Sequence, residues 1–84
     1  MLDMNTANHV LKLLDDTLQL QGQTLDFGPD TPLLGAIPEL DSMAVVALIS
    51  RIEDYFGIVF DDTELTAAAF ADVRSLTRLV ERQL

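Results

Sequence analysis

The stretch Glu39–Ile58, which reads ELDSMAVVALISRIEDYFGI, decides the fold of this chain. After Asp41 and Ser42, apolar residues recur at three- and four-residue intervals, which is the repeat of an amphipathic α-helix. Asp41 is a good N-cap, and Gly57 follows where a left-handed C-terminal cap is favoured. The pattern predicts a helix over residues 42–56; in a register one residue later, Ser42 itself becomes the cap. The expected apolar stripe comprises Val45, Val46, Ile49, Ile52 and Phe56, widened by Leu48 and Tyr55.

A second helix is expected over residues 4–20. Asp3 or Asn5 is a plausible cap, and Gly22 is the expected stop. One face carries apolar residues at helical spacing, with Leu13 and Leu20 beside them: Met4, Ala7, Val10, Leu11, Leu14 and Leu18.

The C-terminal third predicts a short helix followed by a longer one. Residues 58–60 alternate too briefly for a strand and are expected to form an extended link. Asp61 and Glu64 are spaced almost as a capping box, and the short helix they start can continue through the alanine-rich run 65–70. Asp72 is the expected cap of the last helix. Its apolar stripe comprises Val73, Leu76, Val80 and Leu84, with Leu79 beside them.

Residues 21–40 hold almost all of the helix-breaking residues and are expected to form a long connection. A short turn of helix is expected near Leu33 and Leu34. The apolar residues that can pin this loop over the core are Leu25, Phe27, Leu33, Leu34, Ile37 and Leu40. The chain as a whole predicts an all-α fold in one domain, residues 1–84: a small four-helix bundle of three main helices plus a short third helix, with a long ordered first loop.

The charge of the chain restricts its partners. The net charge is −9, which repels nucleic acid and anionic membrane surfaces and attracts basic patches on proteins. Six of the acids lie in residues 41–64, against the single base Arg51. The chain has no cysteine, no visible targeting signal, and no apolar run long enough to cross a bilayer. A cytoplasmic monomer that neither binds nucleic acid nor inserts into membranes is expected.

Catalytic and metal-binding patterns are missing from the sequence. A small hydrolase that uses Ser42 as nucleophile is a third hypothesis, but Ser42 would need a base, and His9 is the single histidine. No phosphate-binding glycine loop and no His/Cys metal spacing occurs, and the acids at 61–64 lack the twelve-residue calcium loop. The arginines at 74, 78 and 82 form one row on the last helix, which is interpreted as a solvated or partner-facing edge.

The segment LDSMAVVALISRIEDYFGI resembles the acyl carrier protein family. The family pattern is Asp-Ser-Leu or Asp-Ser-Met, then apolar residues at helical spacing, then Glu-x-x-Phe-Gly-Ile. This chain matches it with Asp41, Ser42, Met43, Glu53, Phe56, Gly57 and Ile58. Phe70, Asp72-Val73 and Ser75-Leu76 are similar to the last loop and helix of the family. The resemblance covers most of the chain.

The resemblance implies a carrier rather than an enzyme. It implies that a separate phosphopantetheinyl transferase attaches 4′-phosphopantetheine from coenzyme A to Ser42, with Asp41 as motif residue and helix cap. The thiol of the arm then carries acyl groups as thioesters to acyl-transferring, ligating or condensing enzymes with basic docking patches. Fatty-acid, polyketide or related lipid biosynthesis is the expected setting. The alternatives are a peptidyl or aminoacyl carrier of a peptide-synthetase-like pathway, and a small acidic helical adaptor without a prosthetic group.

Two further sets of residues follow from the resemblance. Docking to partners is expected along the second helix and its ends, at Met43, Glu39, Val45, Glu53, Asp54, Asp61 and Asp62. Fatty-acid carriers commonly have acids in the first turns after the modified serine, whereas this chain has Ala44, Val45, Val46 and Ala47 there. Apolar docking contact and a specialised pathway are therefore favoured. An acyl chain would be lined by Val46, Ile49, Ile52, Phe60, Leu65 and Phe70. The alternative is that these residues simply form the core.

Overall fold

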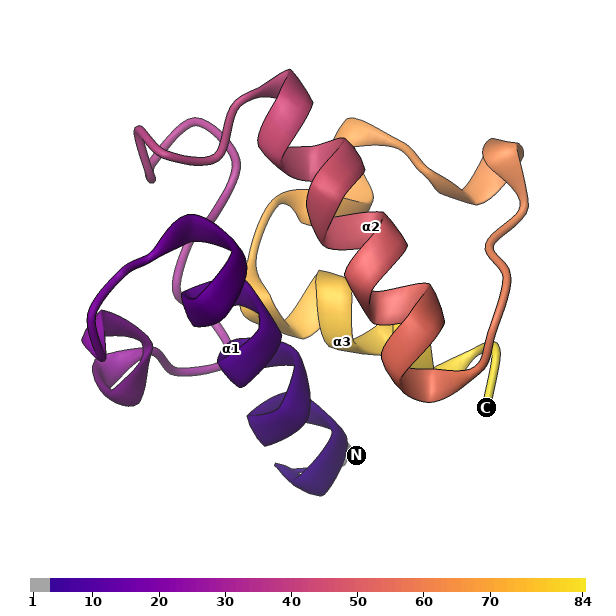
Figure 1. Cartoon of the computed structure of the whole chain (residues 1–84), viewed down its shortest axis with the longest axis horizontal. Coiled ribbons are helices and arrows are strands. Elements are labelled where there is room, and N and C mark those ends of the chain that lie inside the picture. The colour runs from indigo at the N-terminus through magenta and orange to yellow at the C-terminus, as the bar shows by residue number, and fades with distance from the viewer. Residues whose placement is uncertain (1–3) are drawn as a thin grey trace.

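Helices make up all the regular structure in the part of the chain that is described. A computed structural model describes residues 4–84. In chain order the elements are α1 (Met4–Leu18), the 3-10 helix η1 (Gln23–Asp26), α2 (Ser42–Phe56), the 3-10 helices η2 (Asp62–Glu64) and η3 (Ala67–Phe70), and α3 (Val73–Glu81) (Figure 1). The all-α prediction is confirmed. The predicted short third helix is two separate 3-10 helices.

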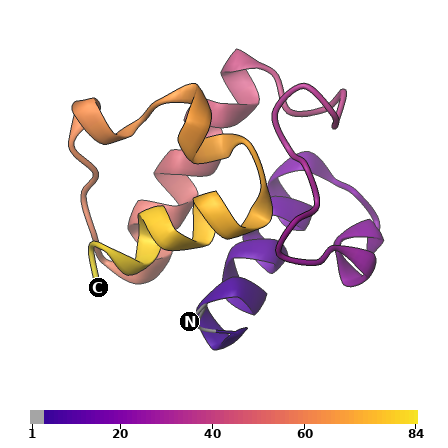
Figure 2. The ribbon, with the colours of Figure 1, turned by 180° about the vertical axis from the view of Figure 1, so that it is seen from behind.

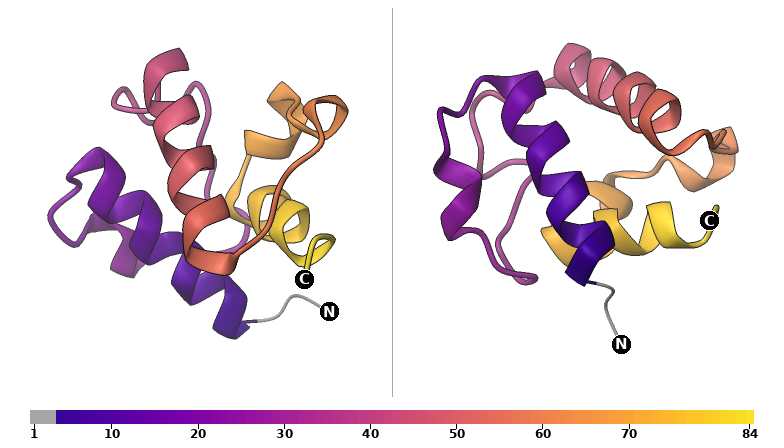
Figure 3. Two further views of the ribbon diagram at one scale, coloured as in Figure 1. Left: turned by 45° about the vertical axis from the view of Figure 1, so that its right-hand side comes forward. Right: turned by 60° about the horizontal axis from the view of Figure 1, so that its bottom comes forward.

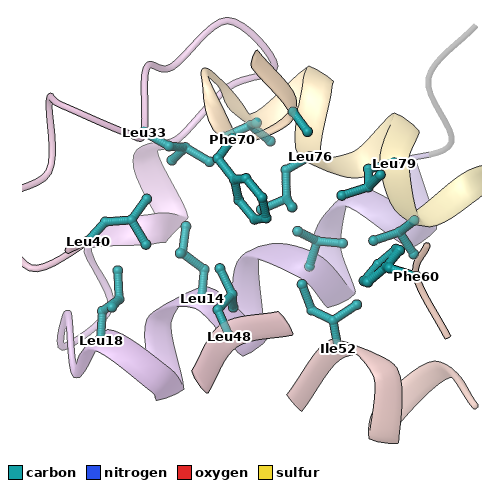
Figure 4. Packing of buried hydrophobic residues seen from close by; sticks show 14 of the residues in the cluster. Leu14, Leu18, Leu33, Leu40, Leu48, Ile52, Phe60, Phe70, Leu76 and Leu79 are labelled. Atoms are coloured by element: carbon teal, nitrogen blue, oxygen red, sulfur yellow. The ribbon is translucent and has the colours of Figure 1, made fainter. Parts of the chain in front are cut away.

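The first helix is the centre of the packing. α1 packs against both α2 and α3, and the segment between α2 and α3 closes the remaining side (Figure 3). Leucines and phenylalanines from all of these parts point into one core, where Phe60 lies beside Ile52 and Phe70 beside Leu76 (Figure 4). Because helices of this length are marginal alone in water, this shared burial holds them in place.

The second helix has the predicted bounds and caps. Asp41 is extended, with φ −99° and ψ −175°, and its side chain accepts a hydrogen bond from the Ala44 N–H. Gly57 ends the helix in the left-handed conformation, with φ 67° and ψ 39°. The predicted buried face was partly wrong. Leu48 and Ile52 are fully buried, whereas Val46 is 67% exposed and Tyr55 is 53% exposed.

The first helix is shorter than predicted. It ends at Leu18 rather than residue 20, because Gln19 and Gln21 adopt positive φ angles of 54° and 57°. These turns bring Leu20 back into the core, where it is buried. Met4, placed on the apolar stripe by its spacing, is exposed. Asn5 lies inside the helix and is not its cap, and Asp3 lies outside the described residues.

The long connection is ordered, as predicted, but fewer of its apolar residues than predicted are buried in the core. Leu33 and Leu40 are buried in the core, whereas Leu34 is exposed and Leu25 is 89% exposed on η1. Residues 33–37 form a hydrogen-bonded turn, since the N–H groups of Ala36 and Ile37 both donate to the Leu33 carbonyl. It is not the expected turn of helix, because Gly35 has a positive φ of 87°. η1 itself was not predicted.

Backbone hydrogen bonds join this connection to the start of α3. The N–H groups of Leu33 and Leu34 donate to the carbonyls of Ala71 and Phe70, and the Arg74 N–H donates to Pro29 at 2.8 Å. Figure 2 shows the connection passing beside the N-terminal end of α3 (Figure 2). The segment that precedes α2 is thus held in place by residues 70–74, which are distant from it in the sequence.

The segment after α2 is divided by its caps. Residues 58–60 form the expected extended link, with Phe60 buried. Asp61 and Glu64 form the predicted capping box of η2, but Thr66 then caps η3 separately through the Ala69 N–H. α3 ends at Glu81, so Leu84 lies beyond its stripe and is exposed. Within residues 4–84, no helix has both the length and the apolar character needed to span a membrane.

Candidate functional site

Ser42 is the first residue of α2 and is exposed to solvent. The first turn of α2 stands at one edge of the molecule, at the top of the left view in Figure 3 (Figure 3). The first N–H groups of any helix lack intrahelical acceptors. Asp41 satisfies one of them, because its Oδ1 atom accepts from the Ala44 N–H at 2.8 Å. Its carbonyl accepts from the Val45 N–H at 2.9 Å, which closes the first helical turn. A hydroxyl is therefore presented on a rigidly capped helix start.

The surface that follows Ser42 along α2 is apolar rather than acidic. Met43 is 83% exposed, and Val46 lies one turn further along, also exposed. The first turn of α2 contains no acidic residue. Glu39, immediately before the cap, is exposed, whereas Val45 is half-buried against the core.

The predicted docking acids lie at the other end of α2 and on the link that follows. Asp54 and Asp62 are exposed. Asp61 is occupied as the cap of η2, and its pKa is lowered because its carboxylate accepts hydrogen bonds from the N–H and the hydroxyl of Thr63. Glu53 is half-buried and accepts the Phe60 N–H at 2.8 Å. Glu53 thus fixes the link after α2, which was not predicted.

His9 is too distant from Ser42 to act as its base. The Nδ1 atom of His9 lies 2.7 Å from the Tyr55 hydroxyl, and its ring packs against those of Tyr55 and Phe56. Tyr55 follows Ser42 by 13 residues on one helix, which is about 20 Å at 1.5 Å per residue. Proton transfer needs hydrogen-bond reach, so this geometry contradicts a Ser42–His9 hydrolase. Among residues 4–84, no three His, Asp or Glu side chains are grouped as a metal site.

Comparison with known proteins decides between a carrier and the other classes. The model of the family described as "phosphopantetheine attachment site" matches residues 8–81. The chain belongs to this carrier family. The carrier is 28% identical over 81 residues to aminoacyl carrier protein 2 of Bradyrhizobium diazoefficiens, across 96% of this chain and 89% of that protein.

A protein of solved structure is more similar to the carrier in sequence than aminoacyl carrier protein 2 is. It is the solution structure of a holo acyl carrier protein from Nitrosomonas europaea, with a TM-score of 0.86 and 41% identity. The match covers 90% of the carrier and 92% of that chain.

Membership of the family sets the general chemistry of the carrier. It is a carrier protein of the acyl carrier type rather than an enzyme, and its cofactor is a covalently attached phosphopantetheine. It interacts with a phosphopantetheinyl transferase and with acyl-handling enzymes. An adaptor without a prosthetic group is therefore ruled out. The residues fit the group, because an exposed hydroxyl at a capped helix start can be reached by another enzyme.

The residues predicted to line an acyl chain fall into three groups. Ile52, Phe60 and Phe70 are buried in the core, and Ile49 and Leu65 pack partly buried against it. Val46 faces solvent and is not part of this cluster. Two surface grooves, one between α1 and η1 and one between η2, η3 and α3, are lined by other residues. The role of the core residues in holding cargo stays a prediction.

Proposed function

We propose that Ser42 is the attachment point of the phosphopantetheine arm. The observation that carries this proposal is the exposed hydroxyl on the first residue of a 15-residue helix. The alternative, that Ser42 is a nucleophile activated by His9, has no support in the geometry, because His9 hydrogen-bonds Tyr55 at the far end of α2. A residue that is reachable but has no base nearby suits modification by a separate transferase.

The helix start also favours the charge that attachment brings. Asp41 takes the Ala44 N–H, which leaves the N–H groups of Ser42 and Met43 for an anionic substituent. The dipole of an exposed helix contributes about 0.3–1 kcal/mol to such a charge at its N-terminus. When attached, the arm supplies a thiol on which acyl groups are held as thioesters. The role of α2 is to present it without burying it.

Partner docking is proposed to combine apolar and charged contacts along α2. Met43 and Val46 give the exposed apolar part beside Ser42. Asp54 and Asp62 give an acidic part at the opposite end, suited to a basic patch on a partner enzyme. We place the carrier in fatty-acid, polyketide or related lipid biosynthesis in the cytoplasm. The solved holo acyl carrier protein, at 41% identity, supports an acyl cargo.

An aminoacyl cargo is the second candidate, supported by the similarity to aminoacyl carrier protein 2. The two candidates are distinguished by identifying the group that the thiol of the arm carries. The protein is purified from its native cells, the thioester is cleaved with hydroxylamine, and the released group is identified by mass spectrometry. A released fatty acyl or polyketide hydroxamate would support an acyl cargo. A released amino acid hydroxamate would contradict it and support an aminoacyl cargo.

The attachment site is tested by substitution of two exposed serines on the same helix. The wild type is incubated with coenzyme A and a broad-specificity phosphopantetheinyl transferase, and its intact mass is measured. We expect one arm on the wild type and on Ser50→Ala, and none on Ser42→Ala. Equal modification of all three proteins would place the arm elsewhere.

A further inference from the structure

Met43 places a thioether in solvent directly after the proposed attachment point. The chain has three methionines and no cysteine, so methionine is its only source of sulfur. Among the described residues, Met43 is 83% exposed and Met4 is 58% exposed. Met43 lies in the first turn of α2, at the top of Figure 1, whereas Met4 begins α1 (Figure 1). Because its side chain is largely exposed, an oxidant dissolved in water can reach Met43.

The position of Met43 makes it part of any surface that acts on Ser42. Consecutive Cα atoms are about 3.8 Å apart, and a stable protein–protein interface covers about 800 Å² on each partner. A transferase must also bring its reacting atoms to about 3–3.5 Å from the Ser42 hydroxyl. An enzyme docked there therefore covers Met43 as well. Val46 is 67% exposed one turn further on, so the transferase meets an apolar surface in which Met43 is the larger side chain.

Oxidation changes the polarity of this contact without changing its charge. Hydrogen peroxide transfers one oxygen atom to the thioether sulfur: the O–O bond breaks, an S–O bond forms, and the second oxygen leaves with both protons as water. The sulfur loses two electrons, and the peroxide gains them. The product, methionine sulfoxide, is polar and is reduced again by sulfoxide reductases. A polar group that is buried in an apolar interface without a hydrogen-bond partner weakens that interface.

We propose that Met43 is an oxidation site that controls attachment of the arm: hydrogen peroxide converts it to the sulfoxide, and the transferase then docks less well. This inference rests on the proposed attachment of the arm to Ser42. Hydrogen peroxide is neutral, so the net charge of −9, which repels anionic oxidants, does not keep it away. The arm ends in a thiol that peroxide also oxidises. Oxidised Met43 thus holds back attachment of a thiol under the conditions that would inactivate it.

The test compares arm attachment before and after oxidation of the full-length apo-protein. The protein is treated with hydrogen peroxide, the peroxide is removed with catalase, and tryptic peptides are analysed by mass spectrometry. Cleavage after Lys12 and Arg51 separates the two described methionines, and Met43 is the single methionine of its peptide. A sulfoxide on Met43 is expected. Attachment from coenzyme A by a phosphopantetheinyl transferase is expected to slow about fivefold or more at low carrier concentration, with KM raised and kcat kept.

Leucine variants show which sulfur is responsible. Leucine replaces methionine with little change in volume and has no sulfur to oxidise. Met43→Leu is expected to react with the transferase at the same rate before and after peroxide, whereas Met4→Leu is expected to slow as the wild type does. A methionine sulfoxide reductase with a dithiol reductant is expected to restore the rate of the wild type. Urea unfolding of the oxidised protein is expected to match that of the untreated protein, because Met4 and Met43 are both exposed.

The possible failures are distinguishable. The proposal is overturned if Met43 stays unoxidised while Met4 is oxidised, if Met43→Leu slows as much as the wild type, or if the slower rate comes with unfolding of the oxidised protein. An arm on Ser42 at the same rate before and after peroxide overturns this inference and leaves the proposed function standing. An untreated protein that takes no arm on Ser42 overturns both.

Discussion

At residue 41 a single carboxylate determines how the start of α2 is built. The Asp41 side chain caps the helix through the Ala44 N–H, and Ser42 follows as the first helical residue, exposed to solvent. The caps at Asp41, Gly57, Asp61 and Asp72 were all predicted from the sequence. Capping depends on a side chain and the backbone within three residues of it, so local sequence suffices.

Removal of the cap at residue 41 is expected to destabilise the protein. Asp41→Ala loses the 2.8 Å hydrogen bond to the Ala44 N–H, and the expected cost is about 1 kcal/mol in the free energy of unfolding. Asp41→Asn keeps a capping oxygen and is expected to stay within a few tenths of a kcal/mol of the wild type. Urea unfolding at pH 7 measures both. Equal destabilisation by the two substitutions would show that the charge of Asp41, rather than its hydrogen bond, matters.

Positive φ angles at glutamine could not have been predicted. Gln19 and Gln21 end α1 two residues early in this conformation. Glutamine is a good helix former and does not favour it. The turn brings Leu20 into the core, and the Asp15 carboxylate accepts the Gly22 N–H at 3.0 Å and the Thr24 hydroxyl at 2.9 Å. Tertiary burial overrides local preference here.

At the scale of the element, the bounds of α2 followed from the sequence but its buried face did not. Apolar residues occupy more than half of the positions of α2. The apolar stripe is therefore wide, and the helix could face the core in two orientations. Packing against α1 buries Leu48 and Ile52 and leaves Val46 in solvent. The same limit applies to Leu25 and Leu84, which are apolar and exposed.

A pair of truncations in α2 tests this orientation. Leu48→Ala removes a fully buried side chain, and the expected loss in the free energy of unfolding is about 2–5 kcal/mol. Val46→Ala removes an exposed one, and a change of no more than about 0.5 kcal/mol is expected. Thermal or urea unfolding measures both. A larger loss from Val46→Ala than from Leu48→Ala would mean that the opposite face of α2 is buried.

The cap of α3 is expected to make stability depend on acid pH. The pKa of Asp72 is lowered mainly because its carboxylate accepts a hydrogen bond from the Ser75 N–H, at 2.8 Å, and also from the Ser75 hydroxyl. A carboxyl whose pKa is lower in the folded state stabilises that state above its unfolded pKa, which is about 3.9. This contribution is lost as the pH falls from about 4 through the lower folded value.

Asp72→Asn isolates this effect, because asparagine caps a helix but does not titrate. The free energy of unfolding of the wild type and of the variant is measured by urea unfolding from pH 7 to pH 3. The advantage of the wild type is expected to be constant near neutrality and to shrink below about pH 4. An advantage that stays the same down to pH 3 would contradict the role assigned to the carboxylate.

At the scale of the whole molecule, contacts between distant segments complete the site. The connection before α2 is held by backbone bonds from Leu33 to Ala71 and from Arg74 to Pro29. No local pattern predicts these pairs, because they depend on how α3 packs against α1. The pattern around Ser42 did predict the family, because its motif is local.

The charge of the whole molecule leads to a prediction about salt. A net charge of −9 on a molecule with a radius of gyration of 11.4 Å destabilises the compact state by self-repulsion. Sodium chloride screens this repulsion, so the free energy of unfolding is expected to rise between about 10 mM and 200 mM salt. A variant with Glu39→Gln, Asp54→Asn and Asp62→Asn is expected to show a smaller rise. Stability that falls with salt would indicate that attractive ion pairs dominate instead.

A tryptic digest of the holo-protein shows directly which residue bears the arm. Trypsin releases the peptide from Leu13 to Arg51, which contains both Ser42 and Ser50. Holo-protein isolated from native cells is digested, and fragmentation of this peptide locates the phosphodiester. All of it is expected to lie on Ser42. A phosphodiester on Ser50, or on a residue outside this peptide, would rule out Ser42 as the attachment point.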